Sequence, residues 1–213
     1  MSHDLTLFGV GTSRTMRAHW MLLELGLDYE SRSIQSRSGE TLSDEFRRLN
    51  PRHKIPVLKH GQFVLTESAA IVQYLSETFA DRKEMYQPRG TRARAELNEL
   101  CYFIMTELDA GSLYVVRRHE GLASIYGEAP TALASAKTYF LHNLEAMASR
   151  IDKAPCLFGE RLSAADILLM TCLDWASVSG IALPKQTVEY RIRIAQRPAY
   201  QAAMKRNFPQ KSR

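Results

Sequence analysis

Two short segments carry side chains suited to binding a small charged peptide. The first is Lys54-Ile55-Pro56, and the second, after a short turn, is Glu67-Ser68. A proline that opens a strand donates no hydrogen bond and often follows a cis peptide bond in a tight turn, so Ile55 can offer its backbone to an extended ligand. Glu67 can take an ammonium group, while Ser68 at a helix start can hold a carboxylate. These residues predict a peptide-binding site, and a γ-glutamyl group carries both charges.

The loop Gly11-Thr12-Ser13-Arg14-Thr15 is a second place for chemistry, because helix-terminal amides can stabilise a thiolate. It contains no cysteine, so the chain cannot run dithiol exchange there with its own residues. Thr12 or Ser13 could donate a hydrogen bond to a sulfur anion, and Arg14 would add a positive charge, which together lower the pKa of a bound thiol. The same hydroxyls could instead be ordinary N-caps.

Residues 5–80 must supply the elements that position these groups. Apolar runs and helical spacing predict strand, helix, strand, helix, two antiparallel strands and a helix, which calls for a mixed sheet flanked by helices. The expected elements are Leu5–Val10, a helix between Gly11 and Gly26, Tyr29–Ile34, Asp44–Leu49, Val57–Lys59, Phe63–Leu65 and a helix from Ser68.

Strand signals vanish after a linker expected over Asp81–Gly90, and the remainder is expected to be helical. Apolar positions mark a long helix through Leu97 and Leu108, which Gly111-Ser112 could kink, and another over Leu133–Met147. A further helix begins at Ser163. There Asp166 completes a capping box, and Leu162 with Ile167 forms a hydrophobic staple.

The Pro56 turn and the Glu67-Ser68 pair resemble the N-terminal domain of glutathione transferases. Leu162–Ile167 and Arg197–Tyr200 resemble segments of that family's all-helical second domain, so the resemblance runs from Leu5 to about Lys205. It implies an α/β thioredoxin-like N-terminal domain over residues 1–82, an all-α C-terminal helical domain over residues 90–213, and a homodimer.

The resemblance also implies roles for individual residues. Counting back from Gly26 without gaps places Phe8 where some classes keep a catalytic tyrosine, which leaves a serine-type or threonine-type site. Thr12 falls at the catalytic serine position, with Ser13 as second choice and Arg14 beside them. Glutathione, the co-substrate, would contact Lys54, Ile55, Pro56, Glu67 and Ser68. Lys54 fits best as the partner of the glycine carboxylate, ahead of Arg52 and His53.

The implied activity is attack of the glutathione thiolate on hydrophobic electrophiles. The electrophile pocket would include Val10, Leu113, Tyr114 and Arg117. Alternatives are a glutathione-dependent isomerase, dehalogenase or peroxidase on the same fold, or a non-catalytic member that serves as an interaction module.

Composition narrows the classes of partner and the cell compartment that we expect. The 213 residues have a net charge of +5, but the basic residues are scattered among acidic ones, so no nucleic-acid partner is expected. No apolar run approaches the roughly 20 residues that cross a bilayer, and no signal peptide is recognisable, so a cytosolic protein is expected. The three cysteines are widely spaced, which favours neither a disulfide framework nor a metal site.

Overall fold

The computed structural model describes residues 4–79, 85–152 and 154–209. The chain forms two compact units, one of residues 1–87 with 195–213 and one of residues 88–194. The division expected from the sequence, 1–82 and 90–213, differs in its assignment of the last helix, which packs with the N-terminal unit. The linker expected over residues 81–90 lies partly outside the described residues.

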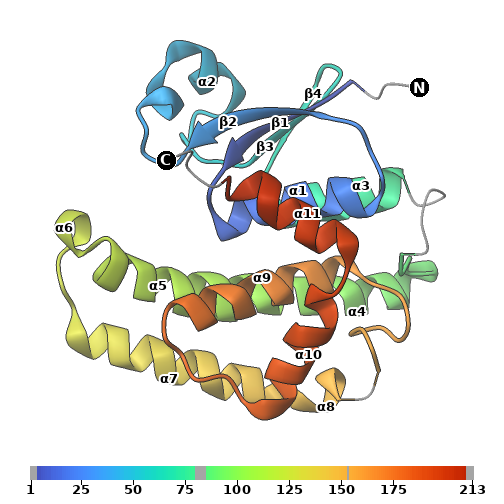
Figure 1. Cartoon of the computed structure of the whole chain (residues 1–213), viewed down its shortest axis with the longest axis vertical. Coiled ribbons are helices and arrows are strands. Elements are labelled where there is room, and N and C mark those ends of the chain that lie inside the picture. The colour runs from blue at the N-terminus through green and yellow to red at the C-terminus, as the bar shows by residue number, and fades with distance from the viewer. Residues whose placement is uncertain (1–3, 80–84, 153, 210–213) are drawn as a thin grey trace. The chain divides into compact units, whose positions relative to one another are not determined.

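A mixed four-stranded sheet forms the centre of the first unit, as predicted. Its strands run in the order β2-β1-β3-β4, with β1 parallel to β2 and antiparallel to β3, and β3 antiparallel to β4 (Figure 1). The strands are β1 (Leu5–Val10), β2 (Glu30–Gln35), β3 (Val57–His60) and β4 (Phe63–Thr66).

Helices cover both faces of this sheet. Helices α1 and α3 lie on one face and α2 on the other, while the last helix, α11, runs beside α1 (Figure 1). The bounds are α1 (Ser13–Glu24), the short 3₁₀ turn η1 (Glu40–Leu42), α2 (Asp44–Leu49), α3 (Ser68–Thr78) and α11 (Pro198–Asn207). The core between the sheet and its α1/α3 face includes Leu7, Trp20, Leu58 and Val72, all fully buried.

Helix α11 is attached to α1 along its length. The Tyr200 ring packs edge-on against Trp20, with ring centroids 5.1 Å apart. Arg197 donates a 2.5 Å hydrogen bond to Glu24 at the C-terminal end of α1. Pro198 is the first residue of the helix, where its missing N–H costs nothing. The apolar face of α11 therefore belongs to the core of the first unit.

The second unit is helical, as predicted. The long helix predicted through Leu97 and Leu108 packs against both α7 and α9. The described elements are α4 (Gly90–Phe103), the π-helical η3 (Ile104–Leu113), α5 (Tyr114–Val116), the π-helical η4 (Arg117–Gly121), α6 (Ala123–Tyr126), α7 (Pro130–Ala146), α8 (Ala148–Ile151), α9 (Ala164–Val178) and α10 (Lys185–Ala195).

The long helix continues through Gly111, the position that could have kinked it. The chain widens instead into the π-helical turns of η3, and the Ser112 hydroxyl donates a 2.5 Å hydrogen bond to the Glu107 carbonyl five residues earlier. A Cβ at position 111 would lie 2.9 Å from the Thr106 carbonyl oxygen. The absence of a side chain at this position therefore permits the wider turn.

The capping box at the start of α9 is confirmed. The Ser163 hydroxyl accepts from the Asp166 N–H, and the Asp166 carboxylate accepts from the Ser163 N–H at 2.7 Å. Leu162 and Ile167, the predicted staple, are both buried.

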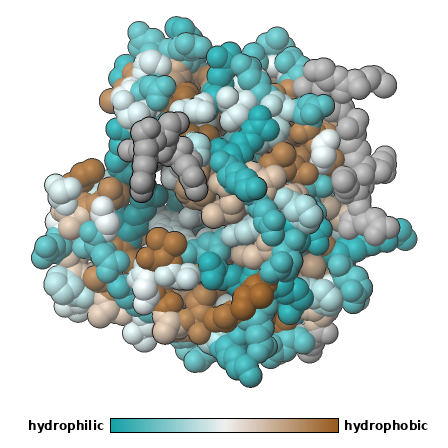
Figure 2. All heavy atoms as spheres, in the orientation of Figure 1, coloured by the Kyte–Doolittle hydropathy of each residue, from teal (hydrophilic) through white to brown (hydrophobic). Residues whose placement is uncertain are grey.

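The cysteines and the surface of the described residues give little further information about function. Cys101, Cys156 and Cys172 are buried, and burial raises the pKa of Cys101 to about 12. Among the described residues, no helix is long and apolar enough to cross a membrane, and no cluster of three potential metal ligands occurs. On the face drawn in Figure 2, hydrophobic residues form small groups separated by hydrophilic ones.

Candidate functional site

The predicted residues of the first unit gather at one end of the sheet. Phe8 near the end of β1 pairs with Val57 at the start of β3, and Val57 pairs with Thr66 at the end of β4. The Ile55-Pro56 turn, the Glu67-Ser68 pair and the start of α1 therefore meet where these strands end.

The turn before β3 lies directly against the end of β1. The Ile55–Pro56 peptide bond is cis, as predicted. Gly9 has φ +117, and a Cβ built on it would lie 2.6 Å from the Cβ of Ile55, so only glycine allows the two segments to approach this closely. Within the described residues, the N–H and C=O of Ile55 make no hydrogen bond. The main chain at Ile55 thus remains available to an extended ligand.

Glu67 has a backbone conformation that is rare for a side-chain-bearing residue. It has φ 68 and ψ 115 at the N-cap of α3, and no side chain caps that helix. Its carboxylate accepts a 2.8 Å hydrogen bond from Arg52, which also donates to the Thr66 hydroxyl. Such strained residues cluster at functional sites. Arg52, considered as a partner of the glycine carboxylate, forms an ion pair with Glu67 in this structure.

Ser68 lies over a buried positive charge. Its side chain is only 3% exposed, and its hydroxyl oxygen accepts a 3.1 Å hydrogen bond from the fully buried guanidinium of Arg17 on α1. Because the oxygen is the acceptor in this contact, the Ser68 proton remains a donor. Arg17 also adds positive charge beneath the N-terminus of α3, where a carboxylate is favoured.

Thr12 is the N-cap of α1, so the capping role considered for it is confirmed. Its hydroxyl accepts from the Thr15 N–H at 3.0 Å, and the Thr15 hydroxyl accepts from the Thr12 N–H at 3.0 Å. The two hydroxyl oxygens are also 3.0 Å apart. Thr12 is half-buried, so its side chain still reaches the surface. Capping and contact with a ligand are compatible.

The other predicted residues of this unit lie around the same place. Ser13 and Arg14 form the first turn of α1 and are half-buried. Lys54 is exposed, and its carbonyl accepts from the Asn50 side chain at 2.8 Å. His53 has φ 54, and its Nδ1 lies 2.8 Å from the Thr41 carbonyl, which ties the turn to the segment before α2.

The buried His19 forms a hydrogen bond with the end of β1. The Nε2 of His19 lies 3.0 Å from the Gly9 carbonyl, and its Nδ1 lies 2.7 Å from the Tyr29 hydroxyl. A carbonyl can only accept, so Nε2 carries the proton and Nδ1 accepts from Tyr29. Burial lowers the pKa of His19 to about 4, and the ring is neutral at physiological pH. Burial also raises the pKa of Tyr29 to about 12.

The residues expected around the electrophile occupy both units. Val10, at the end of β1, is buried in the first unit. In the second unit Leu113 is fully buried, while Tyr114 and Arg117 are half-buried on the helix that follows η3. The shared pocket stays a prediction.

Sequence reasoning missed several residues at this site. Arg17 could have been noticed, because it is a cation within the otherwise apolar pattern of α1. Gly9 gives a weaker signal, as a glycine inside a strand. Asn207, whose side chain contacts the Thr12 loop, gives no signal, because 195 residues separate it from Thr12.

Comparisons with known proteins bear on the family of the chain. Residues 3–77 match the family model described as glutathione S-transferase, N-terminal domain, and residues 103–198 match glutathione S-transferase, C-terminal domain. Bovine glutathione S-transferase theta-1 is 32% identical over 149 residues, which are 68% of this chain. The matched region spans only 61% of that relative.

Solved structures share the fold over nearly the whole chain. A glutathione transferase from Methylococcus capsulatus is 29% identical with a TM-score of 0.80, and the match covers 95% of this chain and 98% of that one. A glutathione transferase homologue from Lodderomyces elongisporus, solved with two GSH per subunit, is 21% identical with a TM-score of 0.84, over 95% of this chain and 98% of that one. Since both family models match in their expected order and the fold agrees throughout, the chain belongs to the glutathione S-transferase family.

Proposed function

We propose that this protein is a glutathione transferase of the serine or threonine type, which activates the glutathione thiol for attack on hydrophobic electrophiles. One observation carries the proposal. At the end of the sheet where β1, β3 and β4 finish, Ile55 has an open main chain, Glu67 is strained at the uncapped start of α3, and the Thr12 hydroxyl caps the start of α1. These groups match the cysteinyl main chain, the γ-glutamyl end and the thiol of one tripeptide.

The residues present fit glutathione along its length. The Ile55 N–H and C=O would pair with the cysteinyl main chain, as an added strand does. The α3 amides, the Ser68 proton and the charge of Arg17 would hold the γ-glutamyl carboxylate. Glu67 has a second carboxylate oxygen besides the one that Arg52 contacts, and it would take the ammonium group. Exposed Lys54 would meet the glycine carboxylate.

Bound glutathione supplies the nucleophilic sulfur, and the chain makes that sulfur ionise. A hydrogen bond from Thr12 to a thiolate contributes about 1.5–3 kcal/mol, which corresponds to roughly one to two pKa units. The free thiol pKa of about 8.5 would fall close to neutrality. Arg14 in the first turn of α1 adds a positive charge that acts in the same direction.

Substitution of the hydroxyls tests this role. We expect Thr12→Ala to lower kcat with a chlorinated aromatic acceptor about tenfold or more, while the affinity for glutathione changes little, because the lost contact forms mainly to the anion. Ser13→Ala is the matched control and should retain most of the turnover. The reverse result would move the role to Ser13, and calorimetry without detectable glutathione binding at millimolar concentration would refute the proposed function.

We also propose that the protein is a homodimer, as its family suggests. Exposed aromatic side chains support this: Tyr102 is 60% exposed and Tyr139 43% exposed in the second unit, and Phe63 is 48% exposed on β4. Large exposed aromatic groups are enriched at protein interfaces. Sedimentation equilibrium should give a mass near twice 24.2 kDa, and Tyr102→Glu should shift it toward the monomer. A monomer at micromolar concentration would contradict this proposal.

A further inference from the structure

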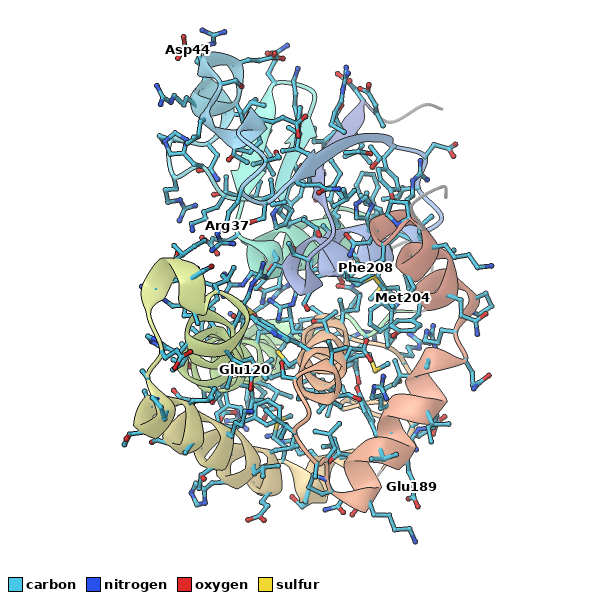
Figure 3. All side chains as sticks on the ribbon, turned by 60° about the vertical axis from the view of Figure 1, so that its left-hand side comes forward. Arg37, Asp44, Glu120, Glu189, Met204 and Phe208 are labelled. Carbon is cyan, nitrogen blue, oxygen red and sulfur yellow. The ribbon has the colours of Figure 1, made fainter. Side chains whose placement is uncertain are left out.

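Asn207, the last residue of α11, reaches the loop between β1 and α1. Its side chain is fully buried. It lies between Met204 and Phe208, which Figure 3 labels on the last helix and at its end. The segment that completes the Thr12 loop thus comes from the far end of the chain.

The Asn207 amide bonds to the loop with both of its ends. Its Nδ2 donates to the Thr12 carbonyl at 3.0 Å. Its Oδ1 accepts from the Thr15 hydroxyl at 2.7 Å and from the Gly11 N–H at 3.2 Å, and its own carbonyl accepts from the same N–H at 2.8 Å. The main chain is therefore fixed on both sides of Thr12.

These contacts also decide which way the hydroxyl protons point. The Thr12 carbonyl already accepts from Asn207 Nδ2 and from the Met16 N–H at 3.0 Å, which occupies its two lone pairs. The Thr15 hydroxyl lies 2.9 Å from that carbonyl and 2.7 Å from Asn207 Oδ1, so its proton goes to Asn207 Oδ1, the shorter contact with an acceptor that is still open. In the 3.0 Å contact between the two hydroxyls Thr12 is then the donor. A thiolate is a stronger acceptor than a hydroxyl and would draw that proton outward.

We propose that Asn207 is a positioning residue, which holds the Thr12 loop and directs the Thr12 hydroxyl proton toward the sulfur of bound glutathione. This inference rests on the proposed function. It adds that the C-terminal helix is part of the thiol-activating apparatus. Without the Asn207 amide, the Thr15 proton returns to Thr12 Oγ1 or to its carbonyl, and the loop loses its bonds on both sides of Thr12.

The readout is the pKa of the bound glutathione thiol, measured through the ultraviolet absorbance of the thiolate. It separates a positioning role of Asn207 from a role in folding stability alone. In Asn207→Ala we expect this pKa to rise by about one unit, a roughly tenfold loss of thiolate below the pKa. At neutral pH kcat should fall about five- to tenfold, while the KM for glutathione changes less than about twofold. Asn207→Asp is isosteric and keeps both acceptor contacts but, when ionised, lacks the donor to Thr12 and adds a negative charge, so its thiol pKa should rise as well.

Arg197→Ala is the matched control, because Arg197 fastens the same helix to α1 through Glu24 at the end opposite Asn207. It should lower the melting temperature and leave the thiol pKa unchanged. An unchanged thiol pKa in folded Asn207→Ala or Asn207→Asp overturns the inference alone. If the unaltered protein binds glutathione without lowering its thiol pKa, thiol activation itself is refuted and this inference falls with it.

Discussion

Single residues at the sheet end combine tight packing with unusual backbone geometry. Gly9 lets the Ile55 turn approach β1, and Glu67 keeps φ 68 although a side chain disfavours it. Positive φ in a residue such as glutamate costs of order 1–2 kcal/mol, which the surrounding structure must offset. The arrangement holds a main-chain edge and an acidic side chain in fixed relation before any ligand arrives, which reduces the ordering cost of binding.

His19 makes the stability of the first unit depend on pH. Its folded pKa of about 4 lies below the 6.5 of the unfolded chain, so the unfolded state binds more protons between these values. Stability is therefore complete above pH 6.5 and falls as the pH drops toward 4. Between pH 7.5 and 5 we expect His19 to account for about 2 kcal/mol of lost unfolding free energy.

Urea unfolding of the His19→Gln variant measures this effect. Glutamine can still donate to the Gly9 carbonyl but does not titrate. The variant should be less stable at pH 7.5 and should show a shallower loss of stability between pH 7.5 and 5 than the unaltered protein. Parallel pH dependences would mean that other groups account for the acid sensitivity.

The sequence predicted helices correctly where local chemistry determines where they begin and end. Asp44–Leu49 has the predicted bounds, and Ser163 with Asp166 caps α9 as expected. The spacing of apolar residues located the long helix but not its π-helical turns. Both α-helical and π-helical turns place apolar residues on one side of the helix, so the wider hydrogen bonding of a π-helix leaves no distinct pattern in the sequence. Gly111 indicated that the helix is irregular there, but not that the irregularity is a π-helical turn.

The Asp166 carboxylate is the most demanding part of the α9 cap. It accepts from the Leu157 N–H, the Tyr190 hydroxyl, and the N–H and hydroxyl of Ser163, at 2.6–2.8 Å. Burial raises its pKa, and the hydrogen bonds from Ser163 and Tyr190 oppose that rise. An asparagine would turn an NH₂ group toward two donors. We expect Asp166→Asn to lower the unfolding free energy by about 3 kcal/mol, because a buried network is broken.

Two further variants calibrate that measurement. Ser163→Ala should lose about 1–2 kcal/mol, the usual contribution of an N-cap. Asp174→Asn makes the same chemical change on the same helix, where the carboxylate is partly exposed and paired with Arg191, and it should cost less than about 1 kcal/mol. If Asp166→Asn costs no more than Asp174→Asn, the Asp166 side chain is protonated in the folded protein.

At the scale of the whole molecule, the last helix of the chain packs with the N-terminal unit. The segment Arg197–Tyr200 was assigned to the C-terminal domain by its resemblance to the family. Periodicity could not correct this, since it shows that a helix has an apolar face and not which core that face covers. The same limit hid Asn207. Its partners, Gly11, Thr12 and Thr15, lie nearly two hundred residues away, and no local pattern encodes a hydrogen bond over that separation.

The anchoring of α11 can be tested through Trp20, which is fully buried against Tyr200. Tyr200 is 7% exposed, so Tyr200→Ala should cost about 3 kcal/mol of unfolding free energy and open the core beside the indole to water. In a Trp175→Phe background Trp20 is the sole fluorophore of its kind, and its emission should shift to the red.

Ile192→Ala removes a large apolar side chain that is 56% exposed, and it should change neither property appreciably. Because Asn207 has its own bonds to the Thr12 loop at the other end of α11, the Tyr200 variant should leave the bound thiol pKa unchanged, as Arg197→Ala does. A rise in the thiol pKa together with the red shift would mean that the two ends of α11 are not held independently.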